Sequence, residues 1–149
     1  MLQIRRARPE DAEALQELYL RHLTQHPPEH PGTPDQWRER LARFAARPDY
    51  FLLVGEEAGR VVSSVTLVLI ENLTHGMRPY ALIENVVTHR DFRGKGHASA
   101  LLAEAARLAE EAGCYKIMLL TGSKRESTLR FYEQNGFLRG EKTGLLKRL

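Results

Sequence analysis

The stretch that decides the fold reads Ile83-Glu84-Asn85-Val86-Val87-Thr88-His89-Arg90-Asp91-Phe92-Arg93-Gly94-Lys95-Gly96-His97-Ala98. Its β-branched half predicts a strand over 80–88, and apolar residues at helical spacing predict a helix over 96–112. The two glycines between them let the backbone turn tightly and approach a ligand closely. The helix has no side-chain acceptor before Ser99 and no acid before Glu104. Its first-turn amides are thus left for an external anion such as a pyrophosphate, although an uncapped helix entered through a flexible turn is an equally open interpretation.

Two other phosphate-binding motifs fit this stretch less well. A P-loop needs a serine or threonine directly after its lysine, and here Gly96 follows Lys95. A dinucleotide-binding fingerprint needs a third glycine where Ser99 stands. The sequence therefore favours an anion-binding turn of another kind.

Before this stretch, the periodicity predicts one strand, two helices and a hairpin. The first helix starts with Pro9 in its first turn and stops at Pro27. The second starts at Thr33 as N-cap, and Gln36 closes a capping box. The predicted strands are 2–5, 50–54 and 61–70, the last two joined by a turn at 57–60.

After the helix over 96–112, the pattern predicts a strand, a helix and two short strands. Residues 115–120 are apolar nearly throughout, which indicates a central strand. Ser123 and Glu126 form a capping-box pattern for a helix that runs to Asn135. The last strands are expected at 137–138 and 145–146. The order is βααβββαβαββ, without repeats or linkers, so we expect one domain over 1–149.

Composition bounds the class of protein. The chain has 149 residues and a net charge of +3. Its single cysteine, Cys114, excludes an internal disulfide framework and permits a reducing compartment. There is no signal-peptide pattern, and no apolar run approaches the ~18 residues of a membrane span. We therefore expect a cytoplasmic protein with no membrane partner.

Charge and histidine patterns point to neither nucleic acid nor metal. Residues 113–149 hold eight basic and three acidic residues, which fits either a solvated face or an anionic partner. The basic residues are dispersed, so we expect no nucleic-acid partner. His22, His26 and His30 are spaced by four, but Pro27 breaks the helix between them and no cysteine or pair of acids completes a set. No metal site is expected.

Two blocks of the chain resemble the GCN5-related N-acetyltransferase (GNAT) superfamily. Residues 93–98, Arg-Gly-Lys-Gly-His-Ala, match the Gln/Arg-x-x-Gly-x-Gly/Ala signature, and residues 131–137 read Phe-Tyr-Glu-Gln-Asn-Gly-Phe. The resemblance implies an α+β sandwich, with a mixed, mostly antiparallel sheet of six or seven strands flanked by about four helices. It also implies a bulge in the fourth strand and a splay between the fourth and fifth strands.

The resemblance further implies that acetyl-coenzyme A (acetyl-CoA) is the cosubstrate and lies in the splay. The backbone of the bulged strand is implied to hold the acetyl and pantetheine arm and to stabilise the oxyanion, and the amides of the glycine turn are implied to bind the pyrophosphate. The implied coenzyme-binding residues are Val86, Val87, Arg93, Gly94, Lys95, Gly96, His97, Ala98 and Arg125.

The catalytic residues follow from the same resemblance. Tyr132 stands where the family commonly places a tyrosine that protonates the leaving thiolate; the alternative is a core tyrosine. Glu84 is the candidate base, directly or through water, and its alternative role is only to bind the amine or a backbone amide. Asn85 either contacts substrate or makes a structural hydrogen bond. Strand alternation places Glu84 and Val86 on one face and Asn85 and Val87 on the other.

The reaction predicted is transfer of an acetyl group to a primary amine by direct attack in a ternary complex. An acyl-enzyme is disfavoured, because Cys114 is expected to be buried and no Gly-x-Ser-x-Gly motif occurs. Arg125 stands where many members carry asparagine, so it either meets a coenzyme phosphate or lies in solvent. His97 is expected to pack against the coenzyme. The alternative function is a non-catalytic acyl-CoA-binding sensor or regulatory module.

The acceptor amine is left open. Residues 83–87, 114–117 and 131–133 are similar to glucosamine-6-phosphate N-acetyltransferases, although that subgroup usually has aspartate where Asn85 stands. Amino sugars, polyamines, small amines and protein amines are all compatible acceptors, and a homodimer is a compatible assembly. Substrate choice is expected to come from 22–33 and 71–79.

Overall fold

A computed structural model describes all 149 residues of the chain. Its strands form one five-stranded sheet in the order β1-β2-β3-β4-β5. The first four strands pair antiparallel, and β4 and β5 run parallel, so the predicted α+β class with a mixed, mostly antiparallel sheet is confirmed. The strands are β1 Gln3–Arg6, β2 Tyr50–Glu57, β3 Arg60–Ile70, β4 Tyr80–Thr88 and β5 Ile117–Leu119.

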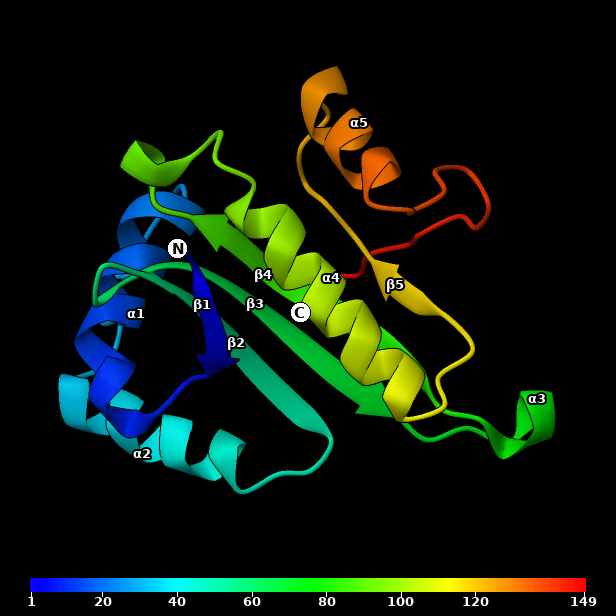
Figure 1. The fold of residues 1–149 in the computed structure, drawn as a ribbon, viewed down its shortest axis with the longest axis horizontal. Coiled ribbons are helices and arrows are strands. Elements are labelled where there is room, and N and C mark those ends of the chain that lie inside the picture. Colours follow the sequence, from blue (N-terminus) through cyan, green and yellow to red (C-terminus); the bar gives the residue numbers. More distant parts are fainter. The chain divides into compact units, whose positions relative to one another are not determined.

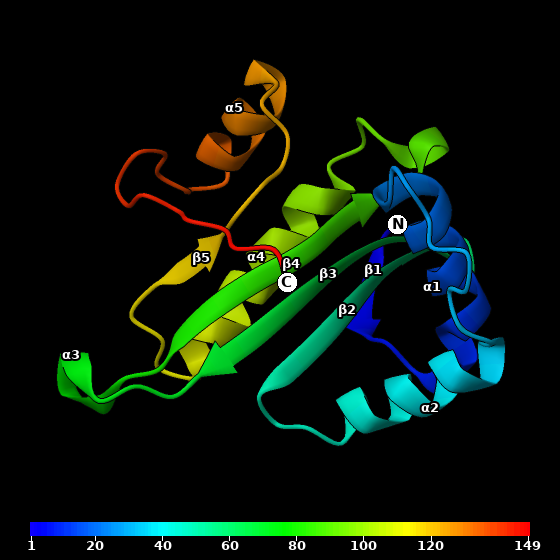
Figure 2. The same ribbon diagram turned by 180° about the vertical axis from the view of Figure 1, so that it is seen from behind.

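Helices cover both faces of this sheet (Figures 1 and 2). The pair α1 and α2 packs on one face and α4 packs on the other. None of the helices combines the length and the apolar character that crossing a membrane requires. The helical elements are η1 Pro9–Asp11, α1 Ala12–Leu18, η2 Tyr19–Leu23, α2 Pro34–Ala45, α3 Thr74–Met77, η3 Arg90–Phe92, α4 His97–Glu111 and α5 Glu126–Gln134.

The start of α2 is closed by its own side chains, as predicted. The Thr33 hydroxyl accepts a hydrogen bond from the Gln36 N–H at 3.2 Å, and the Gln36 side-chain oxygen accepts one from the Thr33 N–H at 2.9 Å. Pro34 occupies the first helical position, where its missing N–H costs nothing. This capping box fixes where α2 begins and therefore where it covers the sheet.

Cross-strand register assigns side chains to the two faces of the sheet. Leu52 and Val54 of β2 belong to a core that includes Leu15 and Leu18 of α1. Leu53 lies between them in the strand and so points to the opposite face, which α4 covers. The buried residues of α4 are His97, Leu101, Leu102, Ala105 and Ala109. Apolar packing on both faces holds β4 and the beginning of α4 on one scaffold.

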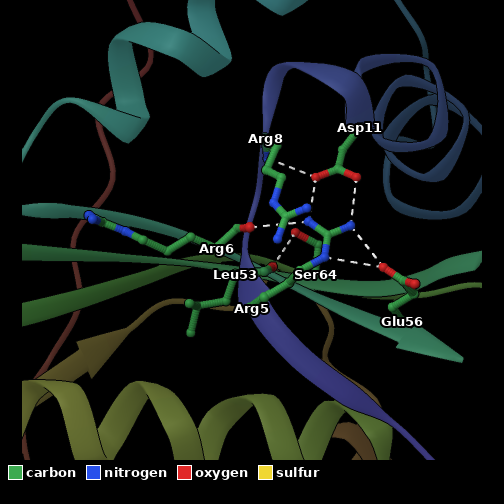
Figure 3. Close-up of polar contacts among 7 residues, drawn as sticks. All are labelled: Arg5, Arg6, Arg8, Asp11, Leu53, Glu56 and Ser64. Atoms are coloured by element: carbon green, nitrogen blue, oxygen red, sulfur yellow. Dashed lines mark hydrogen bonds and ion pairs between the residues drawn. The ribbon is translucent and has the colours of Figure 1, made fainter. Parts of the chain in front are cut away.

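Partly buried ion pairs hold the N-terminal strand β1 against η1 and β2 (Figure 3). The Arg5 guanidinium donates to both carboxylate oxygens of Asp11, at 2.7 and 2.9 Å, and to Glu56 at 2.9 Å. The backbone N–H of Arg8 also donates to Asp11, at 2.7 Å. Burial raises the pKa of the Asp11 carboxyl, but these donors outweigh burial and hold the pKa below its usual value. Arg5 of β1 therefore links Asp11 of η1 to Glu56 of β2.

The chain divides into two compact units, Met1–Met118 and Leu119–Leu149. The second unit contains α5, which starts directly after Arg125 and not at the capping box expected from Ser123. The Ser123 hydroxyl instead accepts from the Arg125 N–H at 3.3 Å and donates to the hydroxyl of Thr128, so it forms a turn before the helix. The expectation of one domain over 1–149 stays a prediction.

The sheet has five strands, not the expected six or seven. Residues 137–138 and 145–146, which were expected to be the last strands, adopt no strand. Each contributes only two apolar residues, and such short segments bury too little surface to hold an isolated hairpin. The strand expected over 115–120 is confirmed only at its centre, and it lies at the edge of the sheet, not in the middle.

Candidate active site

Strand β4 carries a bulge at the residues that the sequence singled out. Its register with β3 shifts by one residue between Glu84 and Val87, and Asn85 adopts a left-handed backbone with a φ of 54°. The bulge implied by the resemblance is therefore confirmed. The extra residue brings Val87 onto the same face as Glu84, so the expected alternation, with Val86 beside Glu84 and Val87 opposite, is wrong; simple alternation holds only in an unbulged strand.

The helix that follows β4 begins without a cap. Its N-cap residue is Gly96, with a φ of 81°, and no side chain accepts a hydrogen bond there. No acid stands in its first turn. Gly94 is also left-handed, with a φ of 77°, and an added Cβ at either glycine would meet no atom within 4 Å. The glycines are thus needed for the backbone conformation, there is open space beside both of them, and no side chain caps the first-turn amides.

Charged side chains surround this glycine turn. The Glu57 carboxylate accepts from Lys95 at 3.2 Å and lies 2.5 Å from the Nε2 atom of His97. These two partners hold the pKa of Glu57 below its usual value. The Arg93 guanidinium donates to the Thr88 carbonyl at 3.1 Å and so spans the turn from the end of β4. Arg93, Lys95 and His97 therefore all lie at the turn, and their contact with the coenzyme stays a prediction.

Two histidines meet next to this turn. The rings of His22 and His89 are 4.1 Å apart between centroids, and Arg60 lies 3.0 Å from the Nε2 atom of His89. Burial and the neighbouring His89 lower the pKa of His22. His26 and His30 do not join them, and no three metal-binding side chains converge anywhere in the structure. The expectation of no metal site stays a prediction.

A cavity of about 690 Å³ opens on the sheet face that α1 and α2 cover. Its wall includes Asn85 from the bulge and Tyr50 from β2. Glu84 is the cross-strand partner of Thr66 on β3, and Thr66 is another wall residue. Glu84 therefore lies on the cavity face of the sheet. The buried hydroxyls of Tyr19 and Thr66 in this wall have no hydrogen-bonding partner. An unpaired buried hydroxyl costs about 1–3 kcal/mol, and such local costs are characteristic of functional sites.

Tyr132 and Arg125 lie in the unit Leu119–Leu149. The ring of Tyr132 packs edge-on against Phe131 and Phe137, at 5.1 and 6.0 Å between centroids. Arg125 is exposed and precedes the first turn of α5. The catalytic role of Tyr132 and the coenzyme contact of Arg125 stay predictions.

Sequence reasoning missed Glu57 and the cavity. Glu57 comes 40 positions before His97, and nothing in the local pattern at the end of β2 marks it as a partner of the glycine turn. Trp37 and Phe44 of α2 pack against the core that includes Leu15 and Leu18, and they also help to line the cavity. The sequence pointed to the cavity in part, because α2 carries these two large aromatic residues, which are only half-buried in the structure.

Comparisons with known proteins agree with this geometry. The model of the acetyltransferase (GNAT) family matches residues 12–137. The solved structure of a candidate acetyltransferase from Agrobacterium tumefaciens is 37% identical, covers 99% of both chains and has a TM-score of 0.88. That of a transcriptional regulator from Bacillus halodurans is 28% identical, covers 100% of both chains and also has a TM-score of 0.88.

Curated relatives match a shorter part. A glucosamine 6-phosphate N-acetyltransferase from Trypanosoma brucei brucei is 35% identical over 55% of this chain and 54% of its own length. The chain thus spans about half the length of the first curated relatives it matches. The family match covers most of the chain, including the bulged strand β4 and the uncapped helix α4. The chain therefore belongs to the GNAT family of N-acetyltransferases.

Proposed function

We propose that this protein transfers an acetyl group from acetyl-CoA to a primary amine by direct attack in a ternary complex. The observation that carries the proposal is the open N-terminus of α4 directly after the bulged strand. Free first-turn amides and the positive end of a helix dipole bind phosphate oxygens without further machinery. An acid or a capping side chain at this position would have argued for a purely structural helix.

The residues at the turn fit the coenzyme that the family implies. The amides of Gly94 to Ala98 would bind its diphosphate, and Arg93 and Lys95 add positive charge beside them. The backbone of Val86 and Val87 would hold the pantetheine arm along β4. When bound, the coenzyme supplies an acetyl thioester for the transfer.

The cavity beside the bulge is the proposed acceptor site. Asn85 lines it and Glu84 lies on the same face of the sheet. The acceptor arrives as an ammonium and must lose a proton before its nitrogen can attack, so we assign Glu84 as the base, directly or through one water. Asn85 is assigned to orient the amine.

We assign the remaining steps to residues of the second unit. A covalent enzyme intermediate is not part of the proposed route. Tyr132 is proposed to donate a proton to the departing thiolate, and Arg125 to meet a coenzyme phosphate. Cys114 is buried, and burial raises the pKa of its thiol, which keeps it from acting as a nucleophile. Direct attack by the amine is the route that these residues support.

The test is release of free coenzyme A from acetyl-CoA with a panel of amines. The panel includes glucosamine 6-phosphate, because curated relatives carry that activity in their names. Glu84→Gln and Tyr132→Phe should each lower kcat by about 100-fold or more while acetyl-CoA still binds. Glu110→Gln, an exposed acid on α4, serves as the control and should leave turnover unchanged. Acetyl-CoA binding without acetylation of any amine would overturn the proposal.

A further inference from the structure

The cavity on the α1 and α2 side of the sheet has an aromatic wall. Tyr19 and Trp37 meet edge-on at 5.9 Å between ring centroids, and Phe44 and Tyr50 stack at 4.2 Å. All four rings line the cavity. Aromatic walls of this kind bind flat apolar bodies, which stack on them without needing polar partners. The volume of about 690 Å³ suits a small molecule and not a folded protein segment.

Two arginines of α2 also line this cavity without any partner. The exposed side chains of Arg40 and Arg43 make no hydrogen bond or ion pair. Arg38, on the same helix, pairs with both Glu13 and Asp35. A free guanidinium offers five donors in a planar fork that matches a carboxylate or phosphate. Arg40 and Arg43 are therefore available to bind an anionic group at the cavity.

The charges around the cavity are divided between its elements. Glu84 lies on the β4 side, and the two arginines lie on α2. The one acid among the lining residues, Glu39, is outnumbered by the arginines. A molecule in the cavity meets cationic side chains at α2, and it lies on the face of the sheet that carries Glu84.

We propose that the acceptor is a primary amine with an apolar, ring-sized body and an anionic group, held with its amine toward Glu84 and its anion toward Arg40 and Arg43. The proposal rests on the function proposed above, because it names the acceptor of that site. It separates the expected acceptor from polyamines, whose second cation would meet the arginines. The proposal also disfavours acceptors with a polar body, because they would leave the aromatic wall without a matching apolar surface.

The experiment compares ligands that differ only in the group opposite the amine. Para-(aminomethyl)benzoate is anionic there, benzylamine is neutral, and para-xylylenediamine is cationic. Binding to the wild-type protein is measured by titration calorimetry, and acetylation is measured separately by release of coenzyme A. The benzoate should bind about tenfold or more tightly than the diamine, because charge-assisted hydrogen bonds favour it. Glucosamine 6-phosphate, an anionic amine with a polar body, should bind more weakly than the benzoate.

Matched variants assign the preference to the arginines. The double variant Arg40→Gln with Arg43→Gln should abolish the preference for the benzoate. The control Arg107→Gln, which removes one positive charge on α4, should keep it. Thermal unfolding checks that the variants fold, since all three arginines are exposed. Equal binding of all three ligands, tighter binding of glucosamine 6-phosphate, or a preference that survives in the double variant would overturn the proposal. Preference in binding without acetylation of any ligand would instead count against the proposed function alone.

Discussion

The N-termini of α2 and α4 present the same chemical problem and solve it in opposite ways. Each begins with backbone amides that have no partner within the helix. In α2, Thr33 and Gln36 close a capping box and Asp35 adds an acid in the first turn. In α4, the N-cap is Gly96, and neither a capping side chain nor an acid is present. The difference matches the proposal that the start of α4 binds a ligand and the start of α2 has a structural role only.

The first N-terminal segment follows the pattern of α2. Asp11 in η1 accepts the Arg8 N–H at 2.7 Å and is also held by Arg5. A carboxylate therefore stands in the first turn of η1 and of α2. The first turn of α4 has none, and the Glu57 carboxylate beside it pairs with the side chains of Lys95 and His97.

The largest effect is expected from adding an acid to the open terminus. Ala98→Asp places a carboxylate in the first turn of α4, where the dipole favours it, and should raise the stability of the ligand-free protein by about 0.3–1 kcal/mol. The same charge repels a diphosphate, so affinity for acetyl-CoA should fall by about a hundredfold or more. Calorimetric titration and thermal unfolding measure the two effects. Unchanged affinity would show that the diphosphate binds elsewhere.

The next effect concerns the closed terminus of η1. Asp11→Asn removes the carboxylate that Arg5 and the Arg8 N–H share, and should destabilise the protein by about 2–3 kcal/mol, as for other low-exposure charged hydrogen bonds. Denaturant unfolding gives the change in free energy. Asp49→Asn, which breaks an exposed pair with Arg47, is the control and should cost much less. Equal losses in the two variants would contradict the role given to the Asp11 network.

The same network predicts a dependence on pH. The pKa of Asp11 is lower in the folded protein than in the unfolded chain, so its stabilising effect is complete above the unfolded value of about 3.9. The effect is lost as the pH falls through the lower, folded value. The stability difference between wild type and Asp11→Asn should therefore be constant near neutral pH and shrink below about pH 4. A difference that grew on acidification would have the wrong sign.

The smallest effect is expected at the start of α2. Thr33→Ala removes one half of the capping box and should cost about 1 kcal/mol of stability, which lowers Tm by roughly 2–4 °C for a protein of this size. Acetyl-CoA affinity should not change, because this terminus is not proposed to bind phosphate. A loss of coenzyme affinity in Thr33→Ala would remove the contrast between the two helices.

The two helix starts also show what the sequence could predict about the fold. The capping box of α2, the bounds of β4 and the open start of α4 were all predicted, because each is set by local residue types such as Thr33 and Gly96. The cap expected from Ser123 was wrong, because serine also stabilises a turn outside a helix. The strands expected at 137–138 and 145–146 depended on pairing with distant segments, which local pattern does not encode.

For the candidate site, residue types in one short stretch were informative and long-range contacts were not. Glu84, Asn85 and the glycine turn were proposed as site residues from the sequence and the resemblance, and their roles stay predictions. That Glu84 and Val87 lie on the same face of the sheet could not be predicted, because the bulge adds a residue that simple strand alternation does not count. Glu57 at the turn and Arg40 at the cavity come from other elements and meet the site only through the fold.

The most direct test follows the backbone amides of both helix starts by NMR during titration with acetyl-CoA. The N–H signals of Gly94, Gly96 and Ala98 should shift most strongly, because they are proposed to bind the diphosphate, and the Gln36 N–H, already bonded to Thr33, should stay unchanged. If acetyl-CoA binds while the signals of the glycine turn stay in place and those of other residues move, the account of α4 as the open, anion-binding terminus is contradicted.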